Sequence, residues 1–147
     1  MPPVRRAALP CLLLCLWASR TQGAVCNVTG VWMSAMGSIL KLAVSPDAEL
    51  GGNYMTSVET MKGAAGNQRQ SRLSGLLNRG AQPTFAFSVV WEGGSSSSWV
   101  GQCLVLGDGS QVLKTLWMLR SAAQGPEDDW KSTRIGEDTF FHLPAEE

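Results

Sequence analysis

The side chains best suited to chemistry in this 147-residue chain are tryptophans that alternate with small hydroxyl residues. Ser95, Ser97 and Trp99 stand at every second position of one run, and Thr115 and Trp117 do so in another. Alternate residues of a β-strand point to the same face. Aromatic walls with a few fixed hydroxyls are typical of a pocket for a small ligand. Buried tryptophans are also ordinary core residues, so the same pattern fits a filled interior.

Residues that would support catalysis or metal binding are sparse. Asp128 and Asp129 would be an acid–base or metal pair, but adjacent carboxylates on an extended chain point apart. The single histidine, His142, stands near the C-terminus between Phe141 and Leu143, where a solvated tail position is expected. The sequence shows no serine–histidine–aspartate set, glycine-rich phosphate loop or cysteine–histidine metal cluster. We therefore expect no enzyme activity, no metal site and no catalytic cofactor.

The tryptophans and hydroxyls fall on short segments that have the pattern of β-strands. Apolar residues occur in short runs between Gly, Ser, Asn, Asp and Pro clusters, and no long run has a helical period. The expected strands are residues 27–34, 38–44, 52–60, 71–78, 84–91, 97–106, 111–120 and 130–141. Asp108-Gly109 is a strong hairpin signal, so neighbouring strands should be antiparallel. The pattern predicts an all-β, eight-stranded antiparallel up-and-down β-barrel, with a two-sheet sandwich as the alternative.

The first 23 residues have the features of a secretory signal peptide. Two arginines near the start precede an apolar stretch over residues 7–18, and a small polar run ends at Gly23. The apolar stretch has only about a dozen residues, whereas a membrane span needs about 20. We expect residues 1–23 to be removed and residues 24–147 to form one secreted, extracellular domain without a membrane segment. An ordinary buried N-terminal helix is the alternative.

Composition and charge exclude several other classes. The chain is 44% hydrophobic and 16% charged, which disfavours disorder. Twelve basic and 12 acidic residues balance, and removal of Arg5, Arg6 and Arg20 with the signal peptide would leave nine basic residues against 12 acidic ones. Such a mildly acidic domain has no basic field for nucleic acid.

Two cysteines, Cys26 and Cys103, follow the signal peptide, and cysteines in an oxidising compartment can pair. Strand parity places Cys26 on the face of Trp32 and Cys103 on the face of Trp99. If both tryptophans point inward, a Cys26–Cys103 bridge is geometrically reasonable. It would tie the first strand to the sixth and contribute about 4 kcal/mol of stability.

Two features predict what happens on the outside of the domain. Asn27, followed by Val28 and Thr29, forms a sequon near the expected N-terminus, so we expect glycosylation at Asn27. In the strand over residues 111–120, Leu116 and Met118 make the face opposite Trp117 apolar as well. A barrel wall that is apolar on both sides must bury its outer side, and self-association is the simplest way to do so.

Several short motifs follow one another in a fixed order along nearly all of the chain after residue 23. They are Thr29-Gly30-Val31-Trp32, Met36-Gly37-Ser38, Gly52-Asn53-Tyr54, Gln82-Pro83-Thr84-Phe85, Trp91, Gly101-Gln102-Cys103, residues 112–120 and Asp128-Asp129-Trp130-Lys131. In this order they resemble the avidin and streptavidin family, and the cysteine positions are similar to its vertebrate avidin branch. The resemblance implies an eight-stranded barrel, a homotetramer and non-covalent binding of biotin, as a ligand rather than a cofactor, in the barrel mouth.

The resemblance also implies roles for polar residues around the ureido ring of biotin. Ser34, Ser38 and Tyr54 match the donors to the ureido oxygen, although well-known members carry asparagine where Ser34 stands. Thr56 and Asp138 match the acceptors of the two ureido N–H groups.

Further matches concern the rest of the ligand. Ser97 matches the hydroxyl near the thioether sulfur, while Trp91, Trp99 and Trp117 match the aromatic walls. Trp130 matches the tryptophan that closes a neighbouring subunit's site.

The carboxylate of biotin is bound in the family from the loop after the third strand and from a serine before the sixth. Ser95 matches that serine, and Thr60 is a further donor in the loop. Parity predicts that Glu59 points outward, opposite to Tyr54. The stretch over residues 62–70 is longer than in the family, and the segment over residues 92–96 is shorter. With Ser34 and these two altered loops, we expect strong binding that falls short of the tightest family members.

The packing region of family barrels is matched by Leu116, Met118 and Ile135, which agrees with a tetramer. Two other interpretations remain: a lipocalin-like carrier of another small molecule, since Gly30-Val31-Trp32 fits the lipocalin triplet G-x-W, and an avidin-like barrel whose biotin site is weakened or lost.

Overall fold

Each of the eight alternating runs forms one strand of the computed structural model, which describes residues 23–144. The strands are β1 (Gly30–Ser34), β2 (Ile39–Val44), β3 (Glu49–Met55), β4 (Gln70–Leu77), β5 (Thr84–Val90), β6 (Ser96–Val105), β7 (Gln111–Arg120) and β8 (Thr133–Leu143). A 3₁₀ helix, η1 (Pro126–Lys131), lies between β7 and β8. The expected signal peptide falls on residues 1–22, outside the described residues, and on Gly23. Within residues 23–144, no helix is long and apolar enough to span a membrane.

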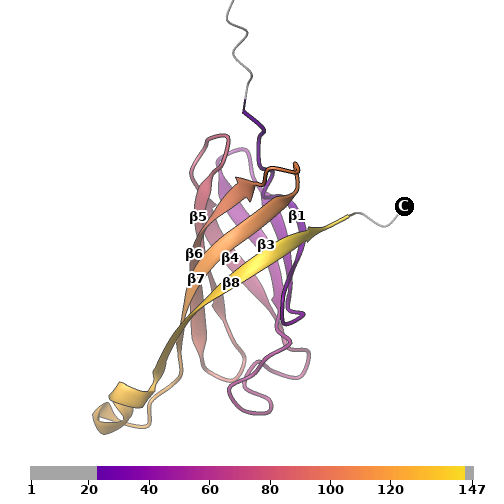
Figure 1. The fold of residues 1–147 in the computed structure, drawn as a ribbon. Helices are drawn as coiled ribbons and strands as arrows, with labels where there is room; N and C mark the ends of the chain where they lie inside the picture. The colour runs from indigo at the N-terminus through magenta and orange to yellow at the C-terminus, as the bar shows by residue number, and fades with distance from the viewer. Residues whose placement is uncertain (1–22, 145–147) are drawn as a thin grey trace, which may run out of the picture.

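Alternation of buried and exposed side chains builds the barrel wall. In β5, Phe85, Phe87 and Val89 are buried, and the residues between them are exposed. Each strand pairs antiparallel with the next one in sequence, and β8 pairs with β1, which closes the barrel (Figure 1). The predicted up-and-down barrel is confirmed and the sandwich is excluded, because closure leaves no free sheet edge.

Three predicted strands differ from the structure by three or more residues at one or both ends. The first begins at Gly30 rather than at residue 27, because the Asn27 side chain accepts the N–H of Thr29 and the chain joins the sheet only after it. The third runs from Glu49 to Met55 rather than over residues 52–60, because the Thr56 side chain bonds to the backbone of Val58 and turns the chain out of the sheet. The last begins at Thr133, because residues 126–131 form η1 instead. A proline at the start of η1 and acidic residues in its first turn favour a helix there.

One end of the barrel is held by the predicted disulfide, which is confirmed. Cys26 and Cys103 are bonded with 5.7 Å between their Cα atoms, joining the segment before β1 to β6. Beside it, the fully buried Trp32 donates its indole N–H to the carbonyl oxygen of Val28 over 2.9 Å. We call this region (Cys26, Val28, Trp32 and Cys103) the disulfide end.

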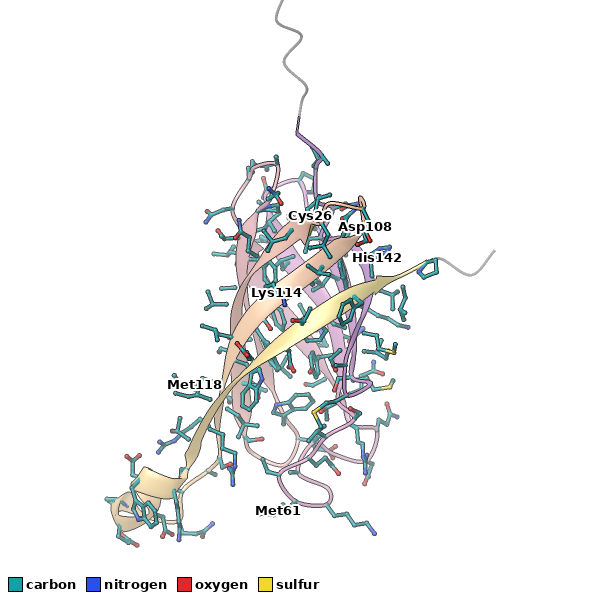
Figure 2. The ribbon with its side chains drawn as sticks, in the orientation of Figure 1. Cys26, Met61, Asp108, Lys114, Met118 and His142 are labelled. Carbon is teal, nitrogen blue, oxygen red and sulfur yellow. A yellow bond between two sulfur atoms is a disulfide. The ribbon has the colours of Figure 1, made fainter. Side chains whose placement is uncertain are left out.

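The single histidine also lies at the disulfide end. His142 is exposed, as expected, but it belongs to β8 rather than to a tail. Its ring packs edge-on against that of Trp32, with 4.8 Å between the ring centroids. Figure 2 shows Cys26 and His142 at one end of the barrel and Met61, in the loop between β3 and β4, at the other.

Candidate functional site

The end opposite the disulfide, which we call the mouth, holds a cavity of about 340 Å³. Ten of the 11 residues predicted to bind a ligand line it: Ser34, Ser38, Tyr54, Thr56, Trp91, Ser95, Ser97, Trp99, Trp117 and Asp138. Trp130 does not line the cavity of its own chain, because it lies on η1 with 82% of its surface exposed. The volume is within the range of small-molecule sites.

Aromatic rings form a fixed wall of the cavity around Tyr54. Its ring centroid lies 4.8 Å from that of Trp99 and 5.8 Å from that of Trp91. Behind Trp99, Phe87 stacks at 5.0 Å with an angle of 17° between the rings. Such contacts hold the rings in place without a ligand.

Trp117 reaches its place in the wall because of a glycine on the neighbouring strand. It pairs with Gly136 of β8, and any Cβ atom at that position would clash with the indole ring. The inward position of Trp117 therefore depends on Gly136 as well as on the tryptophan itself.

The hydroxyls of Ser34, in β1, and Ser38, in the β1–β2 turn, each accept a backbone N–H. Ser34 accepts the backbone N–H of Ser38 over 3.1 Å, so its own proton is free to be donated. Ser38 accepts the backbone N–H of Ser57 over 3.0 Å, and its Oγ lies 3.1 Å from the Ser57 Oγ. Because the Ser57 hydroxyl donates to the carbonyl of Met36, Ser38 is the donor in that contact. Ser57, which sequence reasoning missed, thus fixes the orientation of Ser38.

Ser97, like Ser34, accepts an N–H and keeps its own proton free. The indole N–H of Trp91 donates to its oxygen over 3.0 Å, and both side chains are buried. The hydroxyl proton of Ser97 is then available to an acceptor in the cavity.

Thr56 has the opposite polarity. Its hydroxyl donates to the carbonyl of Val58 over 2.6 Å and accepts the N–H of the same residue over 3.1 Å. Because its proton is already engaged, the remaining lone pair can serve a ligand only as an acceptor.

The ionisable groups of the cavity are shifted by burial. Burial raises the pKa of Tyr54 to about 12, and the charge of Asp138 adds to this while a hydrogen bond with Ser38 opposes it. Tyr54 therefore stays protonated and can donate. Burial also raises the pKa of Asp138, against the effect of the nearby indole N–H of Trp99.

The indole N–H of Trp99 is the one buried side-chain polar group that makes no hydrogen bond among residues 23–144. It faces the Asp138 carboxylate closely enough to influence its pKa without completing a bond. Buried donors without partners are rare in folded proteins and cost free energy.

Glu59 also lines the cavity, which contradicts the outward orientation expected from parity. Its side chain is only 7% exposed and forms an ion pair with Arg69 at 3.3 Å. The expectation is wrong because β3 ends at Met55, so the two-residue period does not extend to Glu59.

The two adjacent aspartates of η1 lie outside the cavity. Asp128 forms an ion pair with Lys131 at 2.7 Å, and Asp129 forms one with Arg120. Each carboxylate thus has its own cation instead of sharing a site. Among the described residues, no group of three or more histidine, cysteine, aspartate or glutamate side chains is placed to hold a metal ion.

The outer face of the wall carries exposed apolar side chains. Leu116, Met118 and Ile135 are 61%, 51% and 70% exposed, and Met118 lies opposite Ile135 in the β7–β8 register. Figure 2 shows Met118 pointing away from the barrel. This patch has no partner within the part of the chain that the structure describes.

Comparison with known proteins agrees with the geometry. A model of the Avidin family matches residues 22–143. Avidin-related protein 1 of Gallus gallus is 41% identical over 132 residues, which cover 88% of this chain and 86% of that protein. The crystal structure of xenavidin has a TM-score of 0.75 and 37% identity, covering 81% of this chain and 99% of that one. A biotin binding protein from chicken has a TM-score of 0.73 and 31% identity, covering 81% and 98%.

Proposed function

The chain belongs to the avidin family, and from this we propose that it binds biotin non-covalently in the barrel mouth. The observation that carries the proposal is the cavity itself, in which fixed aromatic walls surround hydroxyls of defined polarity. The chemistry proposed is binding without catalysis.

The polarity of the side chains suits the ureido ring of biotin. Its carbonyl oxygen needs donors, and the residues Ser34, Ser38 and Tyr54, each with a hydroxyl, line the cavity. The Ser38 proton would turn from Ser57 to the ligand. Its two N–H groups need acceptors, for which we assign Thr56 and Asp138. An ionised acceptor strengthens such hydrogen bonds.

The remaining contacts follow the same assignment. Trp91, Trp99 and Trp117 would enclose the apolar part of the ligand, while Ser97 donates toward the thioether sulfur. Ser95 would meet the end of the side chain. The short side chain of Ser34 weakens one hydrogen bond, and a lost buried hydrogen bond reduces affinity by about 5- to 150-fold.

Retention on biotin-agarose tests this proposal. We expect the folded protein to be retained, and we expect its melting temperature to rise with free biotin, since ligand at about 1,000 times Kd adds about 4.1 kcal/mol. Folded protein that passes through unretained and shows no thermal shift would contradict the proposal.

Two neighbouring serines provide a matched control. Ser97 faces the cavity, whereas Ser98 faces outward and contacts Ser88 over 2.7 Å. Ser97→Ala should weaken biotin binding about fivefold or more, while Ser98→Ala should leave it unchanged. Equal effects of the two substitutions would remove Ser97 from the site.

The outer apolar patch supports a homotetramer as the proposed assembly. Leu116, Met118 and Ile135 would be buried between barrels. Trp130 sits on the hairpin tip that projects beyond the barrel, where it can reach a second subunit (Figure 1). Gel filtration should give a mass of about four subunits, and Met118→Asp should reduce it; a wild-type monomer would contradict this assembly.

Secretion and glycosylation complete the proposal. The Cys26–Cys103 disulfide suits an oxidising compartment. The sequon residue Asn27 is exposed, and its side-chain oxygen accepts the N–H of Thr29 over 3.1 Å, so the amide nitrogen remains accessible. A mass decrease on enzymatic deglycosylation of secreted protein, absent in Asn27→Gln, is the expected result.

A further inference from the structure

The loop between β3 and β4 places a carboxylate in the wall of the mouth. Glu59 lines the cavity, and its side chain is 7% exposed. The groups assigned to the ureido ring, such as Ser34 and Tyr54, are nearly fully buried, whereas this loop lies at the open end with Met61 (Figure 2). A ligand bound by its ureido ring would therefore extend its side chain toward Glu59.

The Glu59 carboxylate occupies backbone donors that would otherwise be available to an anion. It accepts the N–H of Ala65 over 3.0 Å and that of Gly63 over 3.3 Å. Between them, the N–H of Ala64 is bonded to the carbonyl of Met61 over 3.0 Å. Three consecutive donors of the loop are thus engaged within it.

Glu59 keeps its negative charge among the groups around it. Hydrogen bonding to the Ala65 N–H, helped by the Gly63 N–H and Arg69, holds the pKa of Glu59 below its usual value, so the group is anionic at neutral pH. Arg69 pairs with it but is half exposed and does not line the cavity.

Two further charges line the cavity. Asp138 is also acidic, and the exposed Arg134 is directed toward Ser121 over 3.4 Å. The nearby uncharged donors are the hydroxyls of Thr60 and Ser95, which suit an amide carbonyl as well as a carboxylate.

Resting on the proposed biotin site, we propose that the mouth selects biotin with a neutral, amide-linked side chain, as in biotin joined to a lysine, over free biotin acid. A free carboxylate would approach Glu59 with a like charge beside it and with the N–H groups of residues 63–65 already engaged. An amide carries no charge and is served by the remaining hydroxyls.

Titrations of wild-type protein with biotin and with its primary amide at pH 7.5 test the preference. The two ligands have the same size and differ in charge. We expect the amide to bind at least about tenfold more tightly, the scale of one hydrogen bond to a charged group. Free biotin binding as tightly as the amide, or more tightly, would overturn the proposal and indicate that Arg134 controls the mouth.

Glu59→Gln identifies the group responsible, with Glu92→Gln as its control. Glu92 is an exposed acid after β5 that lies against Gly66 of the same loop but does not line the cavity. The amide-to-acid preference should fall several-fold in Glu59→Gln and stay unchanged in Glu92→Gln. An unchanged preference in Glu59→Gln would overturn the proposal.

The ratio of the affinities for biotin amide and free biotin distinguishes an effect of the Glu59 charge from an effect of a disturbed loop. A substitution that only disturbed the loop would weaken both ligands together, leave the ratio unchanged and thus count against the proposal. If neither ligand binds the wild type, the proposed biotin site fails and the preference fails with it, whereas equal binding of both overturns the preference alone.

Discussion

The disulfide end and the mouth of this barrel each bury a tryptophan, but only the disulfide end provides a hydrogen-bond acceptor for the indole N–H. At the disulfide end, Trp32 donates its indole N–H to Val28 over 2.9 Å. In the mouth, Trp99 is only 4% exposed, yet its N–H completes no hydrogen bond among residues 23–144. Because unpaired buried donors cost free energy, the comparison indicates that folding satisfies one end and leaves polar groups of the other for a ligand.

The largest expected effect comes from opening the disulfide end. A Cys26→Ser, Cys103→Ser double variant loses the cross-link between residues 77 apart in sequence, which should lower the free energy of unfolding by about 4 kcal/mol. Denaturant unfolding measures this loss. Biotin affinity of the folded fraction should be unchanged, and a loss of affinity without a loss of stability would break the division between the two ends.

A substitution in the mouth should lower biotin affinity and leave stability nearly unchanged. Tyr54→Phe removes a hydroxyl that stays protonated in the cavity, because burial raises the pKa of Tyr54 to about 12. Biotin affinity should fall by about 5- to 150-fold, as for one lost buried hydrogen bond, with little loss of stability. Calorimetric titration and thermal unfolding of the same samples test both parts, and unaltered affinity would remove Tyr54 from the site.

Trp→Phe at each end of the barrel should have different effects on stability. Trp32→Phe removes a satisfied hydrogen bond and leaves the Val28 carbonyl without its partner, whereas Trp99→Phe removes a donor that has none. Both create similar space, so Trp32→Phe should be the more destabilising by about 1 kcal/mol in ligand-free protein. Equal unfolding free energies would show that the Trp99 N–H is satisfied in solution.

The smallest effect concerns the charge of Asp138. Burial raises its pKa in the folded protein above the usual value near 3.8, so the folded state binds the proton more tightly than the unfolded state. The contribution of Asp138 to the free energy of unfolding is therefore full below its unfolded-state pKa, and it is lost as the pH rises through its folded-state pKa. The melting temperature of Asp138→Asn, relative to wild type, should therefore be higher at pH 7 than at pH 3.5, and a pH-independent difference would contradict the shift.

Period and parity were sufficient to predict the walls of the barrel but not its loop. β7 has the predicted boundaries, and Trp117 points inward as expected, because burial alternates along the strand from Leu113 onward. The orientation of Glu59 depends on contacts with Ala65 and Arg69, which lie six and ten residues further on and follow no period. Trp130 was placed in a strand although Pro126 is a helix-start signal.

The roles of the site residues came from the family resemblance rather than from the pattern. Alternation placed Ser97 and Trp99 on one face, but it carried no information on which atoms are donors. That information comes from the structure, in which the Trp91 N–H determines the direction of the Ser97 proton.

The most direct test of the difference between the two ends is a biotin titration followed by the ¹H–¹⁵N signals of the indole N–H groups. Trp32→Phe and Trp99→Phe assign the two signals that matter. We predict that the Trp99 signal shifts and saturates at one biotin per chain while the Trp32 signal stays in place. If the Trp99 signal does not move at saturating biotin, or if the Trp32 signal moves as far, the Trp99 N–H is not a group that the mouth leaves for the ligand.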